Sequence, residues 1–346
     1  MAYTAINDAN LFFGAKKYTG SGASNAITGV GFQPDFTWVK RTDGAYTHWL
    51  FDSPRGVTKY ISSQNSGAET TDVNSLTSFD SDGFTLGSAT IPNSSGDPYI
   101  SWNWKGGTTS GITTDGNTTI TPNAYSFSAD AGISIVKFTG DNTSGAKVAH
   151  GLGVKPDWIM VKALSGTAHW GNYTAVLGAT KYLVLSDNGQ YYSSAGYWND
   201  TEPDDVNFTL GNNTDTNPSG TDAVAYCFAS KPGFSQMGGY EGNNNADGPF
   251  IYTGFRPAFL MIKKNSGTKN WFTWDNRRNT FNVVTCYLRA DRDLGGDCGV
   301  NFVDFCSNGF KWVTTDGAAN EAGDWDYAAF AEAPLVNSEG VPGNAR

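Results

Sequence analysis

Short runs of alternating hydrophobic and polar residues recur along the chain, separated by residues that favour turns. After Pro34 and Asp35, the run Phe36-Thr-Trp-Val-Lys40 alternates with a period of two, which predicts a β-strand. The runs at 158–161 and 259–262 are apolar at every position, as in a strand that is covered on both faces. A proline ahead of each run suits the start of a strand, where no backbone donor is needed. No long segment has helical periodicity with good caps, so the pattern predicts short strands and turns throughout.

The same pattern occurs three times in one order. The motif GVGFQPDFTWVK at 29–40 recurs as GLGVKPDWIMVK at 151–162 and, with more changes, as YTGFRPAFLMIK at 252–263. Four landmarks accompany it in each copy. They are matching stretches at 18–20, 138–140 and 240–242; His48-Trp49, His169-Trp170 and Asn270-Trp271; matching stretches at 82–87, 206–211 and 307–312; and a closing aromatic strand at 99–104, 224–228 and 327–330. Self-similarity at this spacing indicates tandem repeats.

These features predict an all-β fold of three tandem antiparallel β-sandwich modules, of the jelly-roll or concanavalin-like kind, related by internal repeat. The modules are placed at residues 1–105, 132–233 and 234–334. Residues 106–131 are rich in Gly, Thr, Ser and Asn, and they are interpreted as a linker between the first two modules. Residues 335–346 are expected to form an extended or frayed C-terminal tail.

Composition narrows the classes of partner. Only 16% of the residues are charged, and the net charge is −10. An acidic chain without a basic block is a poor partner for nucleic-acid phosphates or anionic lipids, so we expect neither nucleic-acid binding nor membrane insertion. No run approaches the roughly 20 apolar residues of a membrane-spanning helix. The N-terminal MAYTAINDANLFF lacks the basic and apolar regions of a secretory signal, so we expect a protein made in the cytoplasm without a signal peptide.

Cysteine and histidine give no catalytic arrangement. The four cysteines are too sparse for a disulfide scaffold and have no CxxC spacing. A bridge between Cys298 and Cys306 is left open, although free, partly buried thiols are the expectation. His48 and His169 occupy equivalent repeat positions beside a Trp, and a residue that recurs in this way is interpreted as scaffold. His150 precedes the second motif strand, with no GxSxG elbow to partner it.

Carboxylates and cofactor motifs add no enzyme signature. The densest acidic groups are Asp80-Ser-Asp82 and Glu202-Pro-Asp-Asp205, and both are interpreted as solvated turns. Asp80-x-Asp82 resembles part of a calcium loop but lacks the remaining ligands. Zinc-ligand spacing, phosphate loops and dinucleotide fingerprints are missing from the sequence. We therefore predict no catalytic, metal-binding or cofactor-binding residue; a carboxylate pair assembled from distant strands for glycoside hydrolysis stays an open alternative.

Aromatic residues give the one candidate binding site. Most of the eleven Trp and sixteen Tyr are expected to fill cores. Tyr191 and Tyr192 instead fall in a Gly- and Ser-rich turn that has no counterpart in the other copies, and Tyr197-Trp198 follows. Exposed rings offer flat apolar faces with polar edges, which hold sugars or partner proteins. Tyr191, Tyr192 and Trp198 are therefore the predicted ligand-binding residues, with packing over a neighbouring module as the alternative.

The repeated motifs together resemble a repeat found in virion proteins of tailed bacteriophages. The stretches that carry the resemblance are GFQPDFTWVK, LFDSPRGVTKYISS, SFDSDGFTLG and YISWNWKGG, and later HGLGVKPDWIMVK, NADGPFIYTGFRPAFLMIKK and YAAFAEAPL. They cover nearly the whole chain. The resemblance implies a particle-borne, β-rich structural protein of the tail-fibre-like kind, and it supplies no catalytic residues.

This resemblance implies a non-enzymatic protein at the virion surface that binds other virion proteins and touches a host-surface glycan or protein. Symmetric homo-oligomers are expected, with a trimer favoured. A fibre shaft is missing from the sequence, so a compact module on a tail or capsid is expected. Two alternatives stay open. One is decoration of the capsid as a head fibre or knob; the other is a polysaccharide-degrading tailspike, against which the lack of a short-period β-helix repeat counts.

Overall fold

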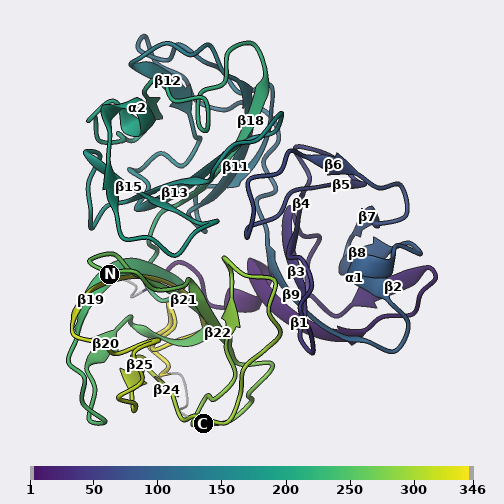
Figure 1. Cartoon of the computed structure of the whole chain (residues 1–346), viewed down its shortest axis with the longest axis vertical. Coiled ribbons are helices and arrows are strands. Elements are labelled where there is room, and N and C mark those ends of the chain that lie inside the picture. Colours follow the sequence, from purple (N-terminus) through teal and green to yellow (C-terminus); the bar gives the residue numbers. More distant parts are fainter. Residues whose placement is uncertain (1–3, 343–346) are drawn as a thin grey trace.

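The computed structural model describes residues 4–342, and nearly every regular element in them is a β-strand (Figure 1). The helical elements of this part of the chain are the 3-10 turn η1 (Ala9–Leu11) and the single turns α1 (Thr90–Asn93) and α2 (Ala195–Trp198). The predicted all-β class is thereby confirmed. Residues 1–3 and 343–346, the latter part of the predicted tail, lie outside the described residues. The described part of the tail folds back on itself, since Val336 bridges Pro342.

Three large antiparallel sheets form the inner layer of the molecule. The first contains β1 (Phe13–Thr19), β3 (Phe36–Arg41), β4 (Trp49–Asp52) and β9 (Pro98–Trp104). The second contains β10 (Ala124–Ser128), β11 (Ile133–Thr139), β13 (Trp158–Ala163), β14 (Gly171–Thr174), β15 (Lys181–Val184), β16 (Tyr192–Ser193) and β18 (Asp222–Phe228). The third contains β19 (Ser235–Gly242), β21 (Phe255–Lys264), β22 (Phe272–Asp275), β23 (Leu288–Arg289) and β26 (Gly323–Pro334).

The three sheets agree in strand order. The order β1-β9-β3-β4 in the first sheet corresponds to β11-β18-β13-β14 in the second and to β19-β26-β21-β22 in the third. In each, the closing strand of the segment lies between its first strand and its motif strand. We refer below to the segments around the three sheets as modules 1, 2 and 3. That the modules are copies of one ancestral unit stays a prediction.

A smaller sheet covers the outer face of each large sheet, which makes each lobe in Figure 1 a sandwich. The small sheet of module 1 contains β2 (Asn25–Thr28), β7 (Leu76–Asp80) and β8 (Gly83–Leu86). That of module 2 contains β12 (Ala146–Ala149) and β17 (Asn207–Leu210), and that of module 3 contains β20 (Phe250–Tyr252), β24 (Val303–Cys306) and β25 (Gly309–Trp312). A two-stranded ribbon of β5 (Lys59–Tyr60) and β6 (Thr70–Thr71) completes module 1.

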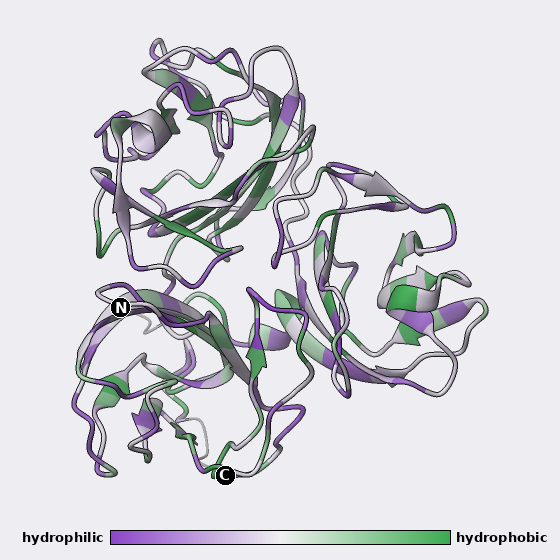
Figure 2. Ribbon diagram, in the orientation of Figure 1, coloured by the Kyte–Doolittle hydropathy of each residue, from purple (hydrophilic) through white to green (hydrophobic). Residues whose placement is uncertain are grey.

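The inner faces of the three large sheets meet in one aromatic core. Trp104 of β9 packs against rings of both other sheets, with centroid distances of 6.4 Å to Phe228, 5.8 Å to Phe259 and 5.6 Å to Phe330. The apolar space left at this centre is only about 20 Å³. The three lobes therefore share a packed centre, and Figure 2 shows the apolar residues concentrated along the strands that converge on it.

The motif strands β3, β13 and β21 are buried along almost their whole length, as predicted for strands covered on both faces. One face of each packs in the common centre and the other faces the small sheet of its own module. Proline precedes β3 and β13, but in module 3 the prediction is wrong, because Pro257 lies inside β21. The pairing with β26 shifts register on both sides of Pro257. Such an irregularity accommodates a residue that has no donor for the ladder.

The interpretation of residues 106–131 as a linker is also wrong in part. Residues 124–128 form β10, which pairs with β11 at the edge of the second sheet. Ile120 is buried in the outer core of module 2, and Thr108 bridges Phe127. Small polar residues dominate this segment, but the alternation Ala-Tyr-Ser-Phe-Ser lets it add a strand to an open edge. The segment therefore packs as part of module 2.

Candidate functional site

Three lysines at the end of the repeated motif join each module to another. Lys40, Lys162 and Lys263 are fully buried at the ends of β3, β13 and β21. Each ammonium group donates to a backbone carbonyl of another module: Lys40 to Asp293 at 3.1 Å, Lys162 to Ser66 at 3.1 Å and Lys263 to Asn188 at 3.4 Å. A lysine of module 1 thus binds module 3, a lysine of module 2 binds module 1, and a lysine of module 3 binds module 2.

Burial lowers the pKa of each of these three lysines to about 8. The amine also donates to carbonyls of its own module; Lys40, for example, donates to Tyr46 at 2.8 Å. Backbone carbonyls therefore satisfy a group that would be costly to bury alone. Through these hydrogen bonds the three lysines link neighbouring modules.

The strand register corrects one landmark of the predicted repeat. In the first sheet Trp49 lies opposite Val39, whereas in the second sheet Gly171 lies opposite Val161. The ladder therefore aligns residue 49 with residue 171, one position beyond the match suggested by the His-Trp pairs. A sequence match follows residue types, and a shift of one residue reverses the face on which every side chain of a strand lies.

Residues 48, 170 and 271 consequently occupy one structural position, and each reaches a carbonyl of another module. The contacts are His48 Nε2 at 3.0 Å from Arg289 O, Trp170 Nε1 donating to Ser62 O at 2.8 Å, and Trp271 Nε1 donating to Val184 O at 2.9 Å. The predicted equivalence of His48 and His169 is wrong. Burial lowers the pKa of His48 well below its usual value, which fits a scaffold role for this residue.

The three predicted ligand-binding residues do not form one exposed surface. Trp198 is only 2% exposed and packs in the outer core of module 2, so its prediction as a contact residue is wrong. Tyr191 is half-buried; its amide donates to the Asn265 carbonyl of module 3 at 3.0 Å, which matches the alternative of packing over a neighbouring module. Tyr192 alone is exposed, and its hydroxyl donates to Asp187 at 3.1 Å.

An open aromatic cleft lies instead in module 1. The ring of Tyr60 stacks on that of Trp49, with centroids 3.7 Å apart. The cleft beside this pair has a volume of about 440 Å³, and Thr47, Asn65 and Glu69 supply part of its wall. Aromatic rings beside amide, hydroxyl and carboxylate groups provide contacts for both the faces and the hydroxyls of a sugar.

Sequence reasoning missed this cleft because Tyr60 was not singled out among the sixteen Tyr, most of which were expected to fill cores. A signal was present in the repeated Thr-Lys-Tyr at 58–60 and 180–182. In module 2 the corresponding Tyr182 stacks on Tyr197 at 3.6 Å, and that ring fills the space that Gly171 leaves. The stacked pair is therefore a feature of both modules.

A second cleft of about 340 Å³ adjoins the first at Thr47 and Asn65, on the border between modules 1 and 3. Asp291 lines this border cleft and is almost fully buried. Its Oδ1 accepts the Trp271 amide at 3.1 Å, whereas its Oδ2 has no hydrogen-bond partner in the described part of the chain. Burial raises the pKa of Asp291 to about 7, so this carboxyl group carries a proton over much of the acidic range.

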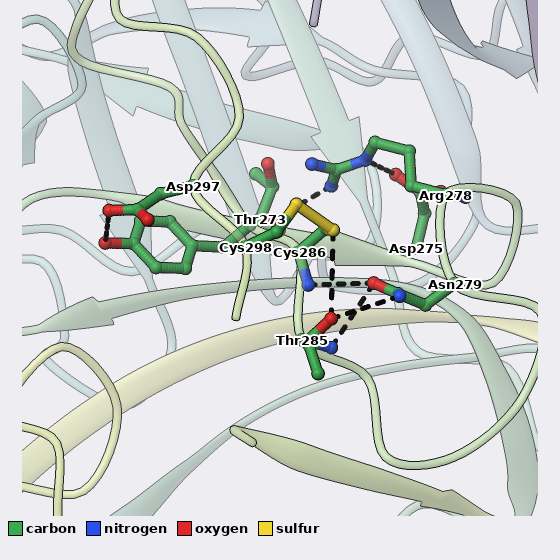
Figure 3. Close-up of a disulfide and its surroundings, with 9 residues drawn as sticks. Thr273, Asp275, Arg278, Asn279, Thr285, Cys286, Asp297 and Cys298 are labelled. Atoms are coloured by element: carbon green, nitrogen blue, oxygen red, sulfur yellow. Dashed lines mark hydrogen bonds and ion pairs between the residues drawn. A yellow bond between two sulfur atoms is a disulfide. The ribbon is translucent and has the colours of Figure 1, made fainter. Parts of the chain in front are cut away.

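A third cleft, of about 390 Å³, lies between modules 1 and 3 and is bordered by a disulfide. Figure 3 shows this bond, which joins Cys286 to Cys298. The expectation of free thiols is wrong for these two residues, and the alternative of a bridge to Cys306 is wrong as well. Tyr287 and Asp297 pair as an antiparallel bridge and so bring the adjacent cysteines together. Among the described residues, the free thiols belong to Cys227 and Cys306.

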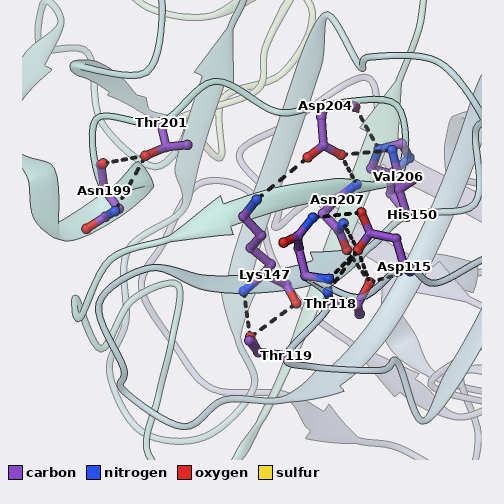
Figure 4. Close-up of polar contacts among 11 residues, drawn as sticks. Asp115, Thr118, Thr119, Lys147, His150, Asn199, Thr201, Asp204, Val206 and Asn207 are labelled. Atoms are coloured by element: carbon purple, nitrogen blue, oxygen red, sulfur yellow. Dashed lines mark hydrogen bonds and ion pairs between the residues drawn. The ribbon is translucent and has the colours of Figure 1, made fainter.

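Figure 4 shows how a polar cluster fastens the segment before β10 to module 2. Asp115 accepts the amides of Asn117 and Thr118, both at 2.9 Å, and the side-chain amide of Asn207 at 3.1 Å. The hydrogen bonds, that from the Asn117 amide foremost, lower the pKa of Asp115 to about 2. His150 is buried nearby, with Nε2 3.2 Å from the Asp204 carbonyl oxygen, and its burial lowers its pKa. These hydrogen bonds anchor the turn at 115–118, and the buried His150 has a structural role beside it.

The carboxylates of the Asp80–Asp82 turn, which the sequence singled out, accept hydrogen bonds from protein donors. Asp80 accepts the hydroxyls of Ser78 and Thr85 at 2.8 and 2.6 Å. Asp82 accepts the amides of residues 29 and 31 at 2.9 and 2.7 Å, and these bonds lower its pKa. Across residues 4–342, no group of three or more His, Cys, Asp or Glu residues is placed to hold a metal ion. Calcium binding thus gains no support from this turn.

Comparison with known proteins places the chain in a family but gives no activity. The sequence profile of a family described as a domain of unknown function (DUF7483) matches residues 8–334. The match spans all three large sheets, from η1 to the end of β26. No curated protein matches the chain. In the described residues, the helices are all too short to cross a bilayer.

Proposed function

The chain belongs to the DUF7483 family, and from the resemblance of its repeated motifs we propose that it is a non-enzymatic structural protein of the tail-fibre type on the virion surface of a tailed phage. It attaches to other virion proteins, forms a symmetric homo-oligomer, with a trimer as the first expectation, and contacts a host-surface glycan or protein. It is made in the host cytoplasm and acts on the particle. The resemblance of the repeated motifs supplies the virion context.

The aromatic core shared by the three lobes is the observation that supports this function. Phe330 of module 3 lies 5.4 Å from Phe13 of module 1 and 5.6 Å from Phe228 of module 2, between ring centroids. No lobe can separate without exposing such rings to water. A protein of this build resists partial unfolding and proteolysis, as a component of a particle outside a cell must.

The aromatic cleft of module 1 supports a glycan as the host ligand. Its volume of about 440 Å³ suits a short oligosaccharide, and Tyr60, which stacks on the buried Trp49, supplies aromatic surface beside amide and carboxylate groups. Tyr192 in module 2 is the remaining residue of the sequence-based site that is exposed. These two surfaces are the contact sites to be compared.

Location on the particle tests the proposal first. Gold-labelled antibody against the protein is viewed by electron microscopy on intact particles, and label at the tail is expected. Label spread over the head overturns the tail-fibre assignment in favour of capsid decoration. Particles without label overturn the virion assignment altogether. Release of reducing sugar from host envelope polysaccharide by the purified protein would replace the non-enzymatic proposal with the tailspike alternative.

A glycan array tests the contact surfaces. The wild-type chain is compared with Tyr60→Ala, with Asn65→Ala, which leaves the aromatic stack intact, and with Tyr192→Ala. Loss of binding in the first two variants is expected, while a Tyr252→Ala variant, changed at an exposed ring in module 3, serves as the matched control. Equal binding by all four variants contradicts the cleft as the glycan site.

A further inference from the structure

A disulfide closes the loop of module 3 that contacts module 1. Cys286 and Cys298 are joined, and residues 287–297 lie between them. Just inside the bond, Tyr287 and Asp297 exchange two backbone hydrogen bonds of 3.0 and 3.1 Å. The tip of the loop reaches across the border to module 1.

The hydrogen bonds that join this loop to module 1 use backbone groups of the loop. Four carbonyl oxygens of the loop contact side chains of module 1. His48 Nε2 lies 3.0 Å from the carbonyl oxygen of Arg289 and 3.1 Å from that of Arg292. The Ser63 hydroxyl donates to Ala290 O at 2.5 Å, and Lys40 donates to Asp293 O at 3.1 Å. In return, the Gly296 amide donates to the Thr42 carbonyl at 2.7 Å. Contacts through the loop backbone depend on the shape of the loop, since a side chain of the loop cannot change rotamer to keep them when its path changes.

We propose that the Cys286–Cys298 disulfide is a reversible thiol–disulfide exchange site whose oxidation state sets the coupling between modules 1 and 3. In the disulfide form the loop is held in the shape that matches module 1. In the dithiol form the loop gains conformational freedom, and its contacts with Lys40, His48 and Thr42 are weakened. This inference does not depend on the function proposed above.

Solvent reaches the bond, as an exchange site requires. Cys298 is exposed and Cys286 is partly exposed, and both line the open cleft of about 390 Å³. Lys17 lines the same cleft, and a cationic neighbour favours the thiolate that takes part in exchange; Arg278, also in the cleft, is paired with Asp275 at 2.5 Å. Asp297, next to Cys298, is already engaged by the Tyr287 hydroxyl at 2.8 Å. Structural disulfides that are buried lack this access.

A dithiol reductant and a disulfide oxidant are enough to drive the exchange in the two directions. Dithiothreitol supplies two electrons and two protons, the bond between the two Sγ atoms breaks to give two thiols, and the reagent becomes a cyclic disulfide. Oxidised glutathione reverses the change; the Sγ–Sγ bond forms again and two molecules of glutathione are released. A thiol-rich compartment therefore leaves the loop open, and an oxidising one closes it.

The two corresponding loops of the molecule provide internal controls. Module 2 contacts the loop at 62–69 of module 1, where Ser66 O accepts the Ala168 amide at 2.9 Å. Module 3 contacts the loop at 184–191 of module 2, where the Tyr191 amide donates to Asn265 O at 3.0 Å. Neither of these loops contains a cysteine. The effect of reduction is accordingly expected at one border of the three.

Hydrogen exchange measured by mass spectrometry on the full chain tests this inference. Mild reduction with dithiothreitol is expected to raise exchange at Tyr287, Gly296 and Asp297 by about tenfold or more, because local opening of the loop becomes easier. Peptides that contain Ala168 and Tyr191 should keep their protection. Reoxidation with oxidised glutathione should restore the slow exchange.

Two variants complete the test. The double variant Cys286→Ser/Cys298→Ser should show the fast exchange without reductant and no further response to it. Cys306→Ser, which removes a half-buried free thiol and keeps the bond, should respond as the wild type does. Unchanged exchange on reduction, with both thiols shown by maleimide labelling to be free, overturns the inference. Equal acceleration at all three borders also overturns it, since the bond would then stabilise the molecule in general.

Discussion

A buried lysine is tolerated only where its ammonium group meets acceptors, and Lys162 shows how closely that requirement is tied to the module borders. Its amine donates to carbonyls on both sides of one border, those of Ser66 and Ala168. A substitution that removes the amine leaves the buried Ala168 carbonyl without that donor, whereas the half-buried Ser66 carbonyl still accepts the Ala168 amide. The cost of an unsatisfied buried polar group is about 1–3 kcal/mol.

Lys162→Met is therefore expected to lower the free energy of unfolding by about 1–3 kcal/mol, since the buried Ala168 carbonyl loses this donor while the side chain keeps its length. Urea denaturation followed by tryptophan fluorescence measures the change. The control is Lys17→Met, at an exposed lysine, which should alter stability by less than about 0.5 kcal/mol. A Lys162 variant as stable as the control would contradict the proposal that the hydrogen bonds of Lys162 stabilise the border between modules 1 and 2.

Asp291 gives a pH dependence with a defined sign. Its pKa in the folded chain is raised to about 7 by burial, above the unfolded value of about 3.9. The protonated form is thus the one that favours folding; the stabilisation is complete below pH about 4 and is lost as the pH rises through 7. The charged groups that face this carboxyl are Arg292 and Lys263. Lys263, with a pKa lowered to about 8, titrates above this range.

Asp291→Asn should remove this loss. Between pH 5 and 7.5 the unfolding free energy of the variant is expected to gain up to about 3 kcal/mol relative to wild type, because the amide has no proton to release. Paired urea titrations across that range measure the difference. The control is Asn65→Ala, which lines the same cleft and changes no titratable group, so its difference from wild type should not vary with pH. A constant difference for Asp291→Asn as well would mean that this carboxyl is already ionised at pH 5.

At the scale of elements, the start of β8 and of β25 depends on glycine because the neighbouring strand passes very close. A Cβ on Gly83 would lie 1.9 Å from the Ile27 carbonyl oxygen, and one on Gly309 would lie 2.1 Å from that of Ile251. Gly83 also has φ +149, which L side chains rarely adopt. In module 2 the corresponding residue is Asn207, whose side chain fastens the turn at 115–118.

Gly83→Ala is expected to destabilise the chain by at least about 2 kcal/mol, because the pairing of β2 with β8 must shift to admit the methyl group. Thermal unfolding measures the effect. The matched control is Gly116→Ala, where nothing lies within 4 Å of the added atom and stability should be unchanged or slightly higher. Equal melting temperatures for the two variants would show that the small sheet tolerates the shift.

The elements also show how far sequence reasoning reaches. The motif strands were predicted because apolar residues on both faces, as in Trp158-Ile-Met-Val, leave a covered strand as the simple solution. The edge strand β10 was missed because small polar residues dominate the segment around it, although an edge strand needs little apolar surface. The disulfide and the cleft of Tyr60 depend on which residues the strand ladder brings together, such as Tyr287 opposite Asp297. Spacing along the chain carries no record of that register.

At the scale of the whole molecule, the largest hydrophobic core lies where the three modules meet. The inner face of each large sheet packs on the inner faces of the other two, so each module buries its apolar surface against its neighbours. The N-terminal segment adds to this, because Phe12 packs edge-to-face on Phe234 of module 3 at 6.0 Å. Three cores that depend on one another should unfold together.

A matched pair of phenylalanines separates the common centre from the outer cores. Phe330→Ala removes a ring that contacts all three modules, and Phe84→Ala removes an equally buried ring from the outer core of module 1. Each change should cost about 3–5 kcal/mol by loss of burial and creation of a cavity. Scanning calorimetry of the wild type should give one transition, and Phe330→Ala should move it intact to lower temperature, since no module keeps its packing when the centre opens. Phe84→Ala should instead raise hydrogen exchange first within β2, β7 and β8. If Phe330→Ala splits the transition into three, each lobe folds by itself and the shared centre is only a contact surface.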